Sequence, residues 1–387
     1  MREIYLDNSA TTPLCEAARK KIVEALDVYG NPSSLHSLGQ RAEALVREAR
    51  EEIMLALGAR AREGELVFTS CGSEANSLAI IGSAHAKERR DARRILISSS
   101  EHPSVKNCAR SLEREGFEVV QIPTRNGVLD LDAVSAALDA RIFLASFMLV
   151  NNETGALYGV KEAFSRIKVA YPDAITHCDA VQGFMKLAFT PKALGADLVS
   201  VSAHKVHAPK GVGALYIDGD IIKKKKISPF LFGGGQEKGL RSGTENTIGI
   251  AAFGAAVADA RVRAEDIRKR LAELYSYAEQ RLTELGVRIN RPLGARADHV
   301  INITVPNIKS ETVLHFLSAD GVFVSSGSAC SASSRKPSEV LMAFGLSADE
   351  ADCSLRISLS EYNTKEDIDA LVSSLGAAMA RLVRIKR

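Results

Sequence analysis

Short apolar, β-branched runs alternate with amphipathic segments through most of the chain. The apolar runs predict seven strands, at 65–69, 94–99, 117–122, 142–150, 174–178, 197–202 and 213–217. Helical patterns fill most of the gaps, and an amphipathic segment at 36–58 precedes the first strand, with Asn31, Ser33 and Ser34 as its start signals. Because strands that alternate with helices form βαβ units, the pattern predicts an α/β protein with a largely parallel sheet.

The last third of the chain has a different pattern. A helical periodicity from about Asn246 to Leu285 is longer than one globular helix usually runs and indicates a crossing into a second domain. Beyond it, strands are predicted at 299–305, 322–325 and 354–360, with helices at 310–320 and after a capping box of Thr364 and Asp367. We therefore predict a large domain over 15–258 and a small α+β domain formed by 1–14 and 259–387.

Composition and charge exclude some classes of partner. The chain has 387 residues, with 46% hydrophobic and 25% charged residues, which is ordinary for a globular protein. A formal charge of +3 does not argue for nucleic acid. The basic run at 221–226 is best explained as a solvated turn or strand end, with a docking patch for an acidic partner as the second reading. Without a signal-peptide pattern or an apolar run near ~20 residues, we expect a cytoplasmic location and no membrane partner.

Six cysteines are scattered without a C-x-x-C pair, which argues against both a disulfide framework and a self-contained zinc site. Cys178 ends an apolar run and is expected to be a buried small hydrophobe. Cys330 differs, because it lies in "SSGSACSASS" at 325–334, where all the remaining residues are serine, glycine or alanine. Packing does not explain a thiol there, and the small residues favour a mobile segment.

Polar side chains follow four predicted strands: His102, Asn152, Asp179 and Lys205. Ligands of open parallel sheets bind outside the carboxyl ends of the strands, so these residues could share one crevice. Lys205, beside His204, is suited to a Schiff base, and Asp179, with Gln182 three residues on, could hold the ring proton of pyridoxal phosphate. Singly, each has an ordinary explanation as a solvated lysine, a helix cap or a surface histidine. Their recurrence after strands is much harder to explain by chance.

A turn after the first strand has the composition of a phosphate cradle. The strand ends at Thr69, small residues follow through Ser73, and a helix is predicted from about Glu74. Neither the Walker pattern nor the G-x-G-x-x-G pattern occurs, so ATP and NAD lose their best support from the sequence.

Ten segments along the chain together resemble the cysteine desulfurases of the iron–sulfur-assembly and nitrogen-fixation type, within the class V aminotransferases. They are "YLDNSATTP", "NPSSLHSLG", "EANSLAI", "EHPSV", "NNETG", "HCDAVQ", "SAHKVHAPKGVGALY", "GGGQEKGLRSGTEN", "SSGSACSAS" and "LRISLS", in that order. The resemblance implies a fold-type I enzyme that depends on pyridoxal 5'-phosphate, with a mainly parallel seven-stranded sheet in its large domain and a small α+β domain.

The resemblance also implies roles for individual residues. Lys205 would carry the cofactor, His102 would stack on its ring, Asp179 would pair with the ring nitrogen, and Gln182 and Asn152 would lie near the ring oxygen. The phosphate would be held by Gly72, Ser73, Ser202 and His204, with Thr244 reaching in from the other subunit of a homodimer. Arg356 would bind the substrate carboxylate, a task for which its forked guanidinium is suited, with Asn31 nearby.

Cys330 falls on the catalytic cysteine of that family. The implied reaction converts L-cysteine to L-alanine, leaves a persulfide on Cys330, and passes the sulfur to an acceptor protein such as an iron–sulfur scaffold or a thiolation enzyme for tRNA or a cofactor. His102 and Lys205 would complete the catalytic set. We expect no intrinsic metal, although Cys330 could ligate an iron–sulfur cluster transiently.

The sequence departs from the family pattern in two places. The phosphate turn commonly reads S-G-A-T-E but here reads "SCGSE", so Cys71 replaces a glycine, restricts the backbone and adds a thiol, while Ser73 keeps a hydroxyl. Relatives usually carry glycine and arginine where this chain has Ser360 and Glu361, which we expect near the surface of the small domain, where they would affect the choice of partner.

Two kinds of alternative function remain open. Within the same fold, the chain could be a selenocysteine lyase or a cysteine-sulfinate desulfinase. From another class, it could be a non-catalytic sulfur carrier or assembly scaffold, although a scaffold would not need the full set of residues around the ring and phosphate.

Overall fold

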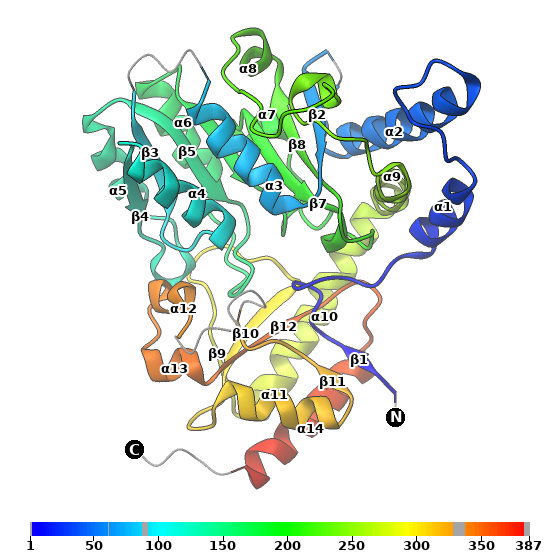
Figure 1. The fold of residues 1–387 in the computed structure, drawn as a ribbon. Coiled ribbons are helices and arrows are strands. Elements are labelled where there is room, and N and C mark those ends of the chain that lie inside the picture. Colours follow the sequence, from blue (N-terminus) through cyan, green and yellow to red (C-terminus); the bar gives the residue numbers. More distant parts are fainter. Residues whose placement is uncertain (1, 61, 87–91, 328–336, 383–387) are drawn as a thin grey trace.

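A computed structural model describes residues 2–60, 62–86, 92–327 and 337–382 (Figure 1). Its larger part is built on a seven-stranded sheet whose spatial order is β2 (Gly64–Thr69), β8 (Gly213–Asp218), β7 (Leu198–Ser202), β6 (Ile175–Asp179), β5 (Ile142–Met148), β3 (Arg94–Ser98) and β4 (Glu118–Ile122). β8 runs antiparallel to both of its neighbours, and the remaining pairs are parallel. The α/β class and all seven predicted strands are therefore confirmed.

Helices cover both faces of this sheet. On one face α3 (Gly72–Ser77), continued by a π-helical turn at Leu78–Gly82, packs with α4 (Pro103–Arg114). The other face is covered by α1 (Glu16–Leu26), α2 (Ser37–Ala56), α6 (Val160–Ala170) and α9 (Thr247–Val262). The alternation of side chains along a strand divides these two cores, since Ile95 and Ile97 enter one core and Leu96 enters the other. Short helices α5 (Leu131–Ala136), α7 (Pro191–Leu194) and α8 (Gly219–Lys223) complete the connections.

The smaller part gathers both ends of the described chain (Figure 1). Its sheet has the order β12 (Ser354–Ser358), β10 (Val300–Thr304), β9 (Arg288–Ile289), all antiparallel, and β1 (Ile4–Tyr5) pairs in parallel with β11 (Val322–Phe323). The helices of this part are α10 (Ala264–Glu284), α11 (Ser310–Ala319), α12 (Glu339–Phe344), α13 (Ala348–Asp352) and α14 (Lys365–Arg381). The capping box predicted for α14 is present, with Asp367 N–H donating to Thr364 Oγ1 and Thr364 N–H donating to the Asp367 carboxylate.

Some predicted boundaries move. The long helical pattern is two helices, α9 and α10, which meet at Arg263, where the backbone leaves the helical region (φ −98°, ψ 11°). The N-cap of α2 is His36, whose Nδ1 accepts from Gly39 N–H at 3.3 Å, while Asn31 caps a separate turn at Ser33. One apolar core contains Ile4 and Leu6 together with residues of α10, α11 and α14. The division of domains at 258/259 stays a prediction.

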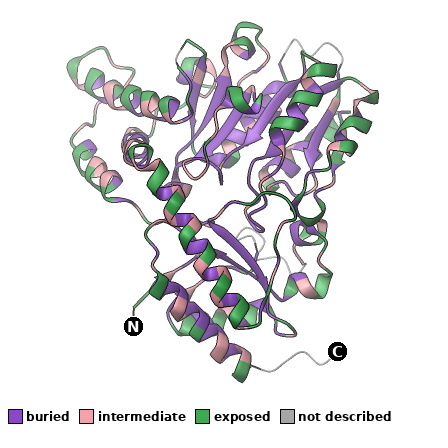
Figure 2. Cartoon of the chain, turned by 180° about the vertical axis from the view of Figure 1, so that it is seen from behind, coloured by how far each residue is buried: buried purple, intermediate pink, exposed green. Residues whose placement is uncertain are grey.

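Burial follows the layers. Figure 2 shows the central strands buried, while helices such as α10 and α14 present exposed and buried faces. Within the described ranges, no helix combines the length and the apolar character that a membrane span needs.

Candidate active site

One edge of the large sheet collects the carboxyl ends of its strands. Thr69 at the end of β2 and Ser202 at the end of β7 both pair with Gly213, so both strand ends lie beside the start of β8. Met148 at the end of β5 pairs with Asp179 at the end of β6. A cavity of about 190 Å³ opens at this edge. The predicted site residues that line it are Gly72, Ser73, His102, Asn152, Asp179, Gln182, Ser202, His204, Lys205 and Arg356.

Lys205 enters the cavity from a 3₁₀ turn, Ala203–Lys205, that directly follows β7. Its Nζ donates to the main-chain carbonyls of Ser9 at 2.5 Å and Ala10 at 2.6 Å. His204, the residue before it, is held by Thr11, whose Oγ1 lies 3.2 Å from Nδ1. Burial, reinforced by the charge of Lys205, lowers the pKa of His204 to about 3, so its ring is neutral at physiological pH.

His102 and Asp179 lie on neighbouring walls of the cavity. Ser104 N–H donates to His102 Nδ1 at 3.1 Å, so a neutral ring carries its proton on Nε2. Burial lowers the pKa of His102, and the Asp179 charge opposes this shift. The Asp179 carboxylate accepts from Asn76 Nδ2 at 2.7 Å and from Val181 N–H at 3.0 Å. These two donors orient the carboxylate, which can accept a further proton-bearing group.

Among the site residues predicted from the sequence, three buried polar atoms lack a hydrogen-bond partner within the described chain: Ser202 Oγ, Gln182 Oε1 and Arg356 Nε. Leaving a buried polar group unsatisfied costs about 1–3 kcal/mol, so each of these atoms favours a polar ligand. The Ser202 hydroxyl and the Arg356 N–H can donate to phosphate or carboxylate oxygens, whereas the Gln182 amide oxygen can accept from a ring hydroxyl. These groups around a lysine therefore fit pyridoxal phosphate with an amino acid bound beside it.

The turn between β2 and α3 is shaped for a close approach. A Cβ added at Gly72 would lie 2.9 Å from Val181 Cγ2 and 3.3 Å from Ser202 Cβ, so a larger residue would crowd the cavity wall. Cys71, the N-cap of α3, has φ −172° and ψ 172°, an extended conformation open to any residue. The expectation that Cys71 would restrict the turn is therefore wrong, whereas its position on the cavity wall agrees with a second thiol near a ligand.

Arg356 reaches the cavity from β12 of the smaller part. Its side chain is almost wholly buried, with Nη2 donating to Asp7 Oδ1 at 2.7 Å and Nη1 to the Asn152 carbonyl at 3.0 Å. The guanidinium is thus fixed by two acceptors from different parts of the chain, while its Nε is available to a ligand.

Two predicted site residues lie elsewhere, and a third is not described. Asn31 and Thr244 are exposed and are not part of the cavity lining, so within one chain they do not join the other residues. Cys330, with the rest of the serine- and alanine-rich segment from 328, falls outside the described residues.

Other cavity contacts were not assigned from the sequence. Ser9 and Ala10 accept from Lys205, Asn76 orients Asp179, and Asp7 anchors Arg356. All of them lie in segments, "YLDNSATTP" and "EANSLAI", that carry the family resemblance but had been given no role. The small and polar residues gathered in those two segments were the signal that could have identified these contacts.

The positions of Ser360 and Glu361 correct another expectation. Ser360 is 6% exposed and the Glu361 side chain is 12% exposed, so neither lies on the surface of the smaller part. Both follow β12, and Glu361 faces the turn after Lys205, where its carboxylate lies 3.4 Å from His207 Nε2. Glu361 therefore affects an internal contact with the larger part, whereas the Ser360 N–H donates to Asn363 Oδ1 at 2.8 Å.

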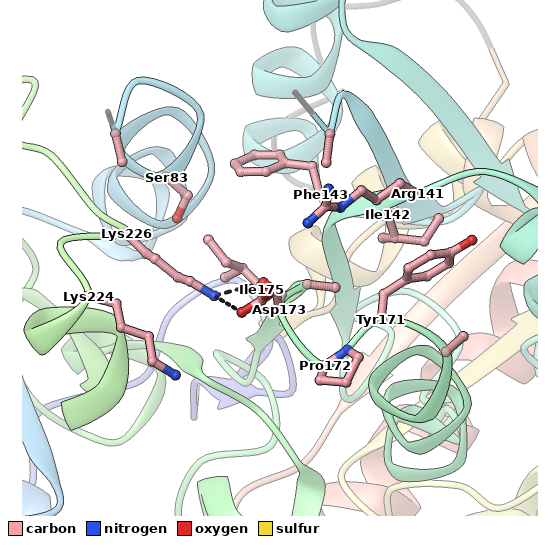
Figure 3. Close-up of a pocket in the computed structure, with 14 residues that line it drawn as sticks. Ser83, Arg141, Ile142, Phe143, Tyr171, Pro172, Asp173, Ile175, Lys224 and Lys226 are labelled. Carbon is pink, nitrogen blue, oxygen red and sulfur yellow. Dashed lines mark hydrogen bonds and ion pairs between the residues drawn. The ribbon is translucent and has the colours of Figure 1, made fainter. Parts of the chain in front are cut away.

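A second cavity, of about 480 Å³, opens at the opposite edge of the sheet, where β5 and β6 begin (Figure 3). Lys224 and Lys226 of the basic run line it, with Arg141 on the other side. Lys226 Nζ donates to Asp173, at 2.9 Å to the carbonyl and 3.4 Å to Oδ1, and so links two loops. Three of the four lysines of the run are exposed, as expected, but the run continues from helix α8 into a turn and is not a strand end.

Comparisons with known proteins establish the family of the chain. The class-V aminotransferase model matches residues 4–371. A cysteine desulfurase IscS from Dictyoglomus turgidum is 39% identical, with 98% of this chain and 95% of the relative aligned. Among solved structures, a NifS-like protein has a TM-score of 0.90 at 33% identity, covering 98% of this chain and all of that one.

A further solved structure, described as SspA in complex with cysteine, has a TM-score of 0.80 at 34% identity, covering 94% of this chain and all of the other. The family match and these relatives extend over nearly the whole chain, including both walls of the cavity. The chain therefore belongs to the class-V aminotransferase family and, within it, to the cysteine desulfurases of the IscS and NifS type.

Proposed function

We propose that this protein is a pyridoxal-phosphate-dependent cysteine desulfurase that converts L-cysteine to L-alanine and retains the sulfur as a persulfide on Cys330. The observation that carries the proposal is the set of unsatisfied buried atoms, Ser202 Oγ, Gln182 Oε1 and Arg356 Nε, around Lys205 in a member of this family. When bound, the cofactor supplies an electron sink for the carbon atoms of the substrate.

Cofactor binding is assigned to the sheet edge. The main-chain N–H groups of the turn at Gly72 and Ser73, with Ser202 and His204, would hold the phosphate, and Thr244 would be added by a second subunit. Asp179 would hold the proton of the ring nitrogen, His102 would lie against the ring, and Asn152 and Gln182 would contact the ring oxygen. The neutral His204 ring suits this role, because it can donate to phosphate without adding a competing charge to Lys205.

Substrate handling is assigned to Arg356, Lys205 and Cys330. Arg356 would bind the carboxylate of cysteine, with Asn31 nearby, and the Lys205 amine would move the proton at the α-carbon. The Cys330 thiolate would attack the substrate sulfur, so that an S–S bond forms as the Cβ–S bond breaks. The electron pair stays with the carbon, which takes a proton, and alanine leaves. An acceptor protein, such as an iron–sulfur scaffold or a thiolation enzyme, would then take the sulfur. The cytoplasmic location and transient cluster binding at Cys330 stay predictions.

The test measures alanine and persulfide formation from cysteine. The wild type should form both products, Cys330→Ala should bind cofactor normally but lose at least 100-fold in desulfuration, and Lys205→Ala should lose the Schiff-base absorption and activity. Ser334→Ala, in the same segment, is the matched control and should behave like the wild type. If Cys330→Ala releases selenium from selenocysteine or sulfite from cysteine sulfinate as fast as the wild type, or sulfide from cysteine without loss, the result would favour a lyase or desulfinase of the same fold. A wild type that cannot be reconstituted with cofactor would favour a scaffold.

A further inference from the structure

The turn that carries Lys205 continues into a strained and tightly held histidine. His207 has φ 61°, a left-handed conformation that is uncommon for a residue with a side chain. Its N–H donates to Thr12 Oγ1 at 2.7 Å, and its ring packs edge-on against Tyr362 with centroids 4.8 Å apart. Cys15 N–H donates to the His207 carbonyl at 2.9 Å. These contacts fix His207 between the N-terminal segment and the chain after β12, and they outweigh the backbone strain.

The hydrogen bonds of the ring define its protonation. Nδ1 lies 2.9 Å from the Pro13 carbonyl, which can only accept, so Nδ1 carries a proton. Nε2 lies 3.4 Å from Glu361 Oε2, and the two side chains are only 10% and 12% exposed. Burial raises the pKa of the Glu361 carboxyl, but the contacts with His207 and Arg263 outweigh it and lower this pKa below its usual value. The ionised Glu361 carboxylate therefore faces the second ring nitrogen at close range, and the geometry describes a buried His207–Glu361 pair.

Basic groups surround Glu361 on every side. Arg263, at the junction of α9 and α10, lies 3.9 Å from Glu361 Oε1 and is bound to Asp259 at 2.5 Å. The Lys186 amine is buried without a hydrogen-bond partner in the described chain; burial lowers its pKa to about 8, and the Glu361 charge opposes that shift. Tyr362 and Cys15 complete the titratable groups near the ring. A positive charge at position 361 would therefore meet His207, Arg263 and Lys186 together.

The pair joins the two halves of the catalytic cavity. His207 lies two residues after Lys205 on the sheet side, and Glu361 lies five residues after Arg356 on the β12 side. The N-terminal segment runs between them. The Ser9 carbonyl accepts from the Lys205 amine, and the Ser9 N–H donates to Ser358 Oγ at 2.9 Å. Resting on the proposed desulfurase function, we propose that the His207–Glu361 pair sets the spacing between the Lys205 amine and the Arg356 guanidinium, with Glu361 as a positioning residue.

The first test is thermal unfolding of the cofactor-free protein between pH 5.5 and 9. Glu361→Arg should lower the Tm by roughly 5–10 °C at pH 6, because it places like charges together in a buried site. His207→Gln in the same chain should relieve part of this loss, because the amide oxygen of glutamine can accept from the new guanidinium. Glu273→Arg, a charge reversal at an exposed position of α10, is the matched control and should show no coupling to His207→Gln.

The second test concerns catalysis. With full cofactor occupancy, Glu361→Gln should raise the KM for cysteine about tenfold with a smaller change in kcat, because Arg356 binds the carboxylate before and during the reaction. Glu361→Asp, which keeps the charge, should recover most of the loss.

Opposite outcomes separate the parts of the proposal. Equal Tm losses for Glu361→Arg with and without His207→Gln, at every pH, would refute the pair. A coupled Tm loss with unchanged KM and kcat in Glu361→Gln would refute the positioning role while leaving the pair. A wild type that forms no alanine would refute the proposed function and the positioning role with it. The His207–Glu361 pair would then be tested by the stability measurements alone.

Discussion

Buried polar atoms connect the local structure of this protein to its chemistry. Asp179 has both carboxylate oxygens bonded, whereas Ser202, Gln182 and Arg356 each keep one polar atom unsatisfied at the same cavity. Asp179 is therefore oriented before a ligand binds, whereas the other three residues complete their hydrogen bonds with the ligand. Such a difference between neighbours depends on geometry at the level of single atoms, because every one of these side chains is polar and buried.

Glu101 gives a prediction for the pH dependence of stability. Burial raises the pKa of this carboxyl to about 8, and its Oε1 accepts from Ser98 Oγ at 2.5 Å and Met148 N–H at 2.9 Å, while Oε2 has no partner within the described chain. The folded state therefore holds a proton that the unfolded chain releases above about pH 4.5. The free energy of unfolding that this proton contributes is fully present below pH 4.5. Above that pH it falls by about 1 kcal/mol per pH unit, up to about pH 8.

Glu101→Gln should remove that loss, since an amide imitates the protonated carboxyl. The stability of the variant relative to wild type should rise between pH 5 and pH 8 and then level off, measured by urea unfolding at fixed ionic strength. Glu113→Gln, at an exposed position of α4, is the control and should give a flat difference. A flat difference for Glu101→Gln as well would show that Glu101 is ionised in the folded protein.

At the scale of elements, strand register places the site. Thr69 and Ser202 pair with the same residue, Gly213, which brings the phosphate turn beside the end of β7. A Cβ added at Gly213 would lie 2.5 Å from the Cys71 carbonyl carbon, so the two segments approach closely only because position 213 has no side chain. The α3 turn therefore depends on glycines in two elements that are far apart in the sequence.

Gly72→Val should weaken cofactor binding more than it weakens folding. The branched side chain would meet Val181 and Ser202 in the wall of the cavity, and such overpacking costs about 1–3 kcal/mol. We expect the Kd for pyridoxal phosphate, measured by absorbance titration, to rise about 10- to 100-fold. Gly159→Val, where the nearest atom to the new Cβ is Glu162 Oε2 at 3.5 Å, is the matched control. Equal affinity in both variants would mean that the phosphate does not approach Gly72.

At the scale of the whole molecule, the exposed surface points to a second subunit. Phe230, Leu231 and Phe232 form an exposed apolar run, with Phe232 81% exposed. Ser242 N–H donates to the Leu231 carbonyl at 3.3 Å, which places the run close to the loop that carries the exposed Thr244. The residue proposed to serve the site of another subunit thus lies beside a surface that favours burial.

Phe232→Asp should shift a homodimer toward monomer, because it puts a charge where apolar contact is expected. The molar mass by light scattering should fall with dilution, and cofactor retention should fall with it if Thr244 acts across the interface. Val169→Asp, which is also highly exposed but on α6, is the control and should leave the mass unchanged. A wild type that is monomeric at all concentrations would contradict the dimer, and Thr244 would lose its proposed role.

Much of this protein was determined by local sequence. Short continuous apolar runs predicted the seven strands, because burial on both faces of a parallel sheet favours unbroken stretches of β-branched and other apolar residues. The polar residues at strand ends predicted His102, Asp179 and Lys205 as neighbours, because parallel strands end at one edge. The capping box of α14 could also be predicted, because its two residues are close together in the sequence.

Only the tertiary structure decided what depends on distant segments. The partners of Lys205 at Ser9 and Ala10 and the burial of Glu361 against His207 arise where chain regions more than 150 residues apart come together. Local propensity carries no information about such contacts, since the identity of a residue does not specify which remote carbonyl or charge it will meet. Sequence alone therefore determined the layers and the chemical types at the site, and packing decided their protonation and orientation.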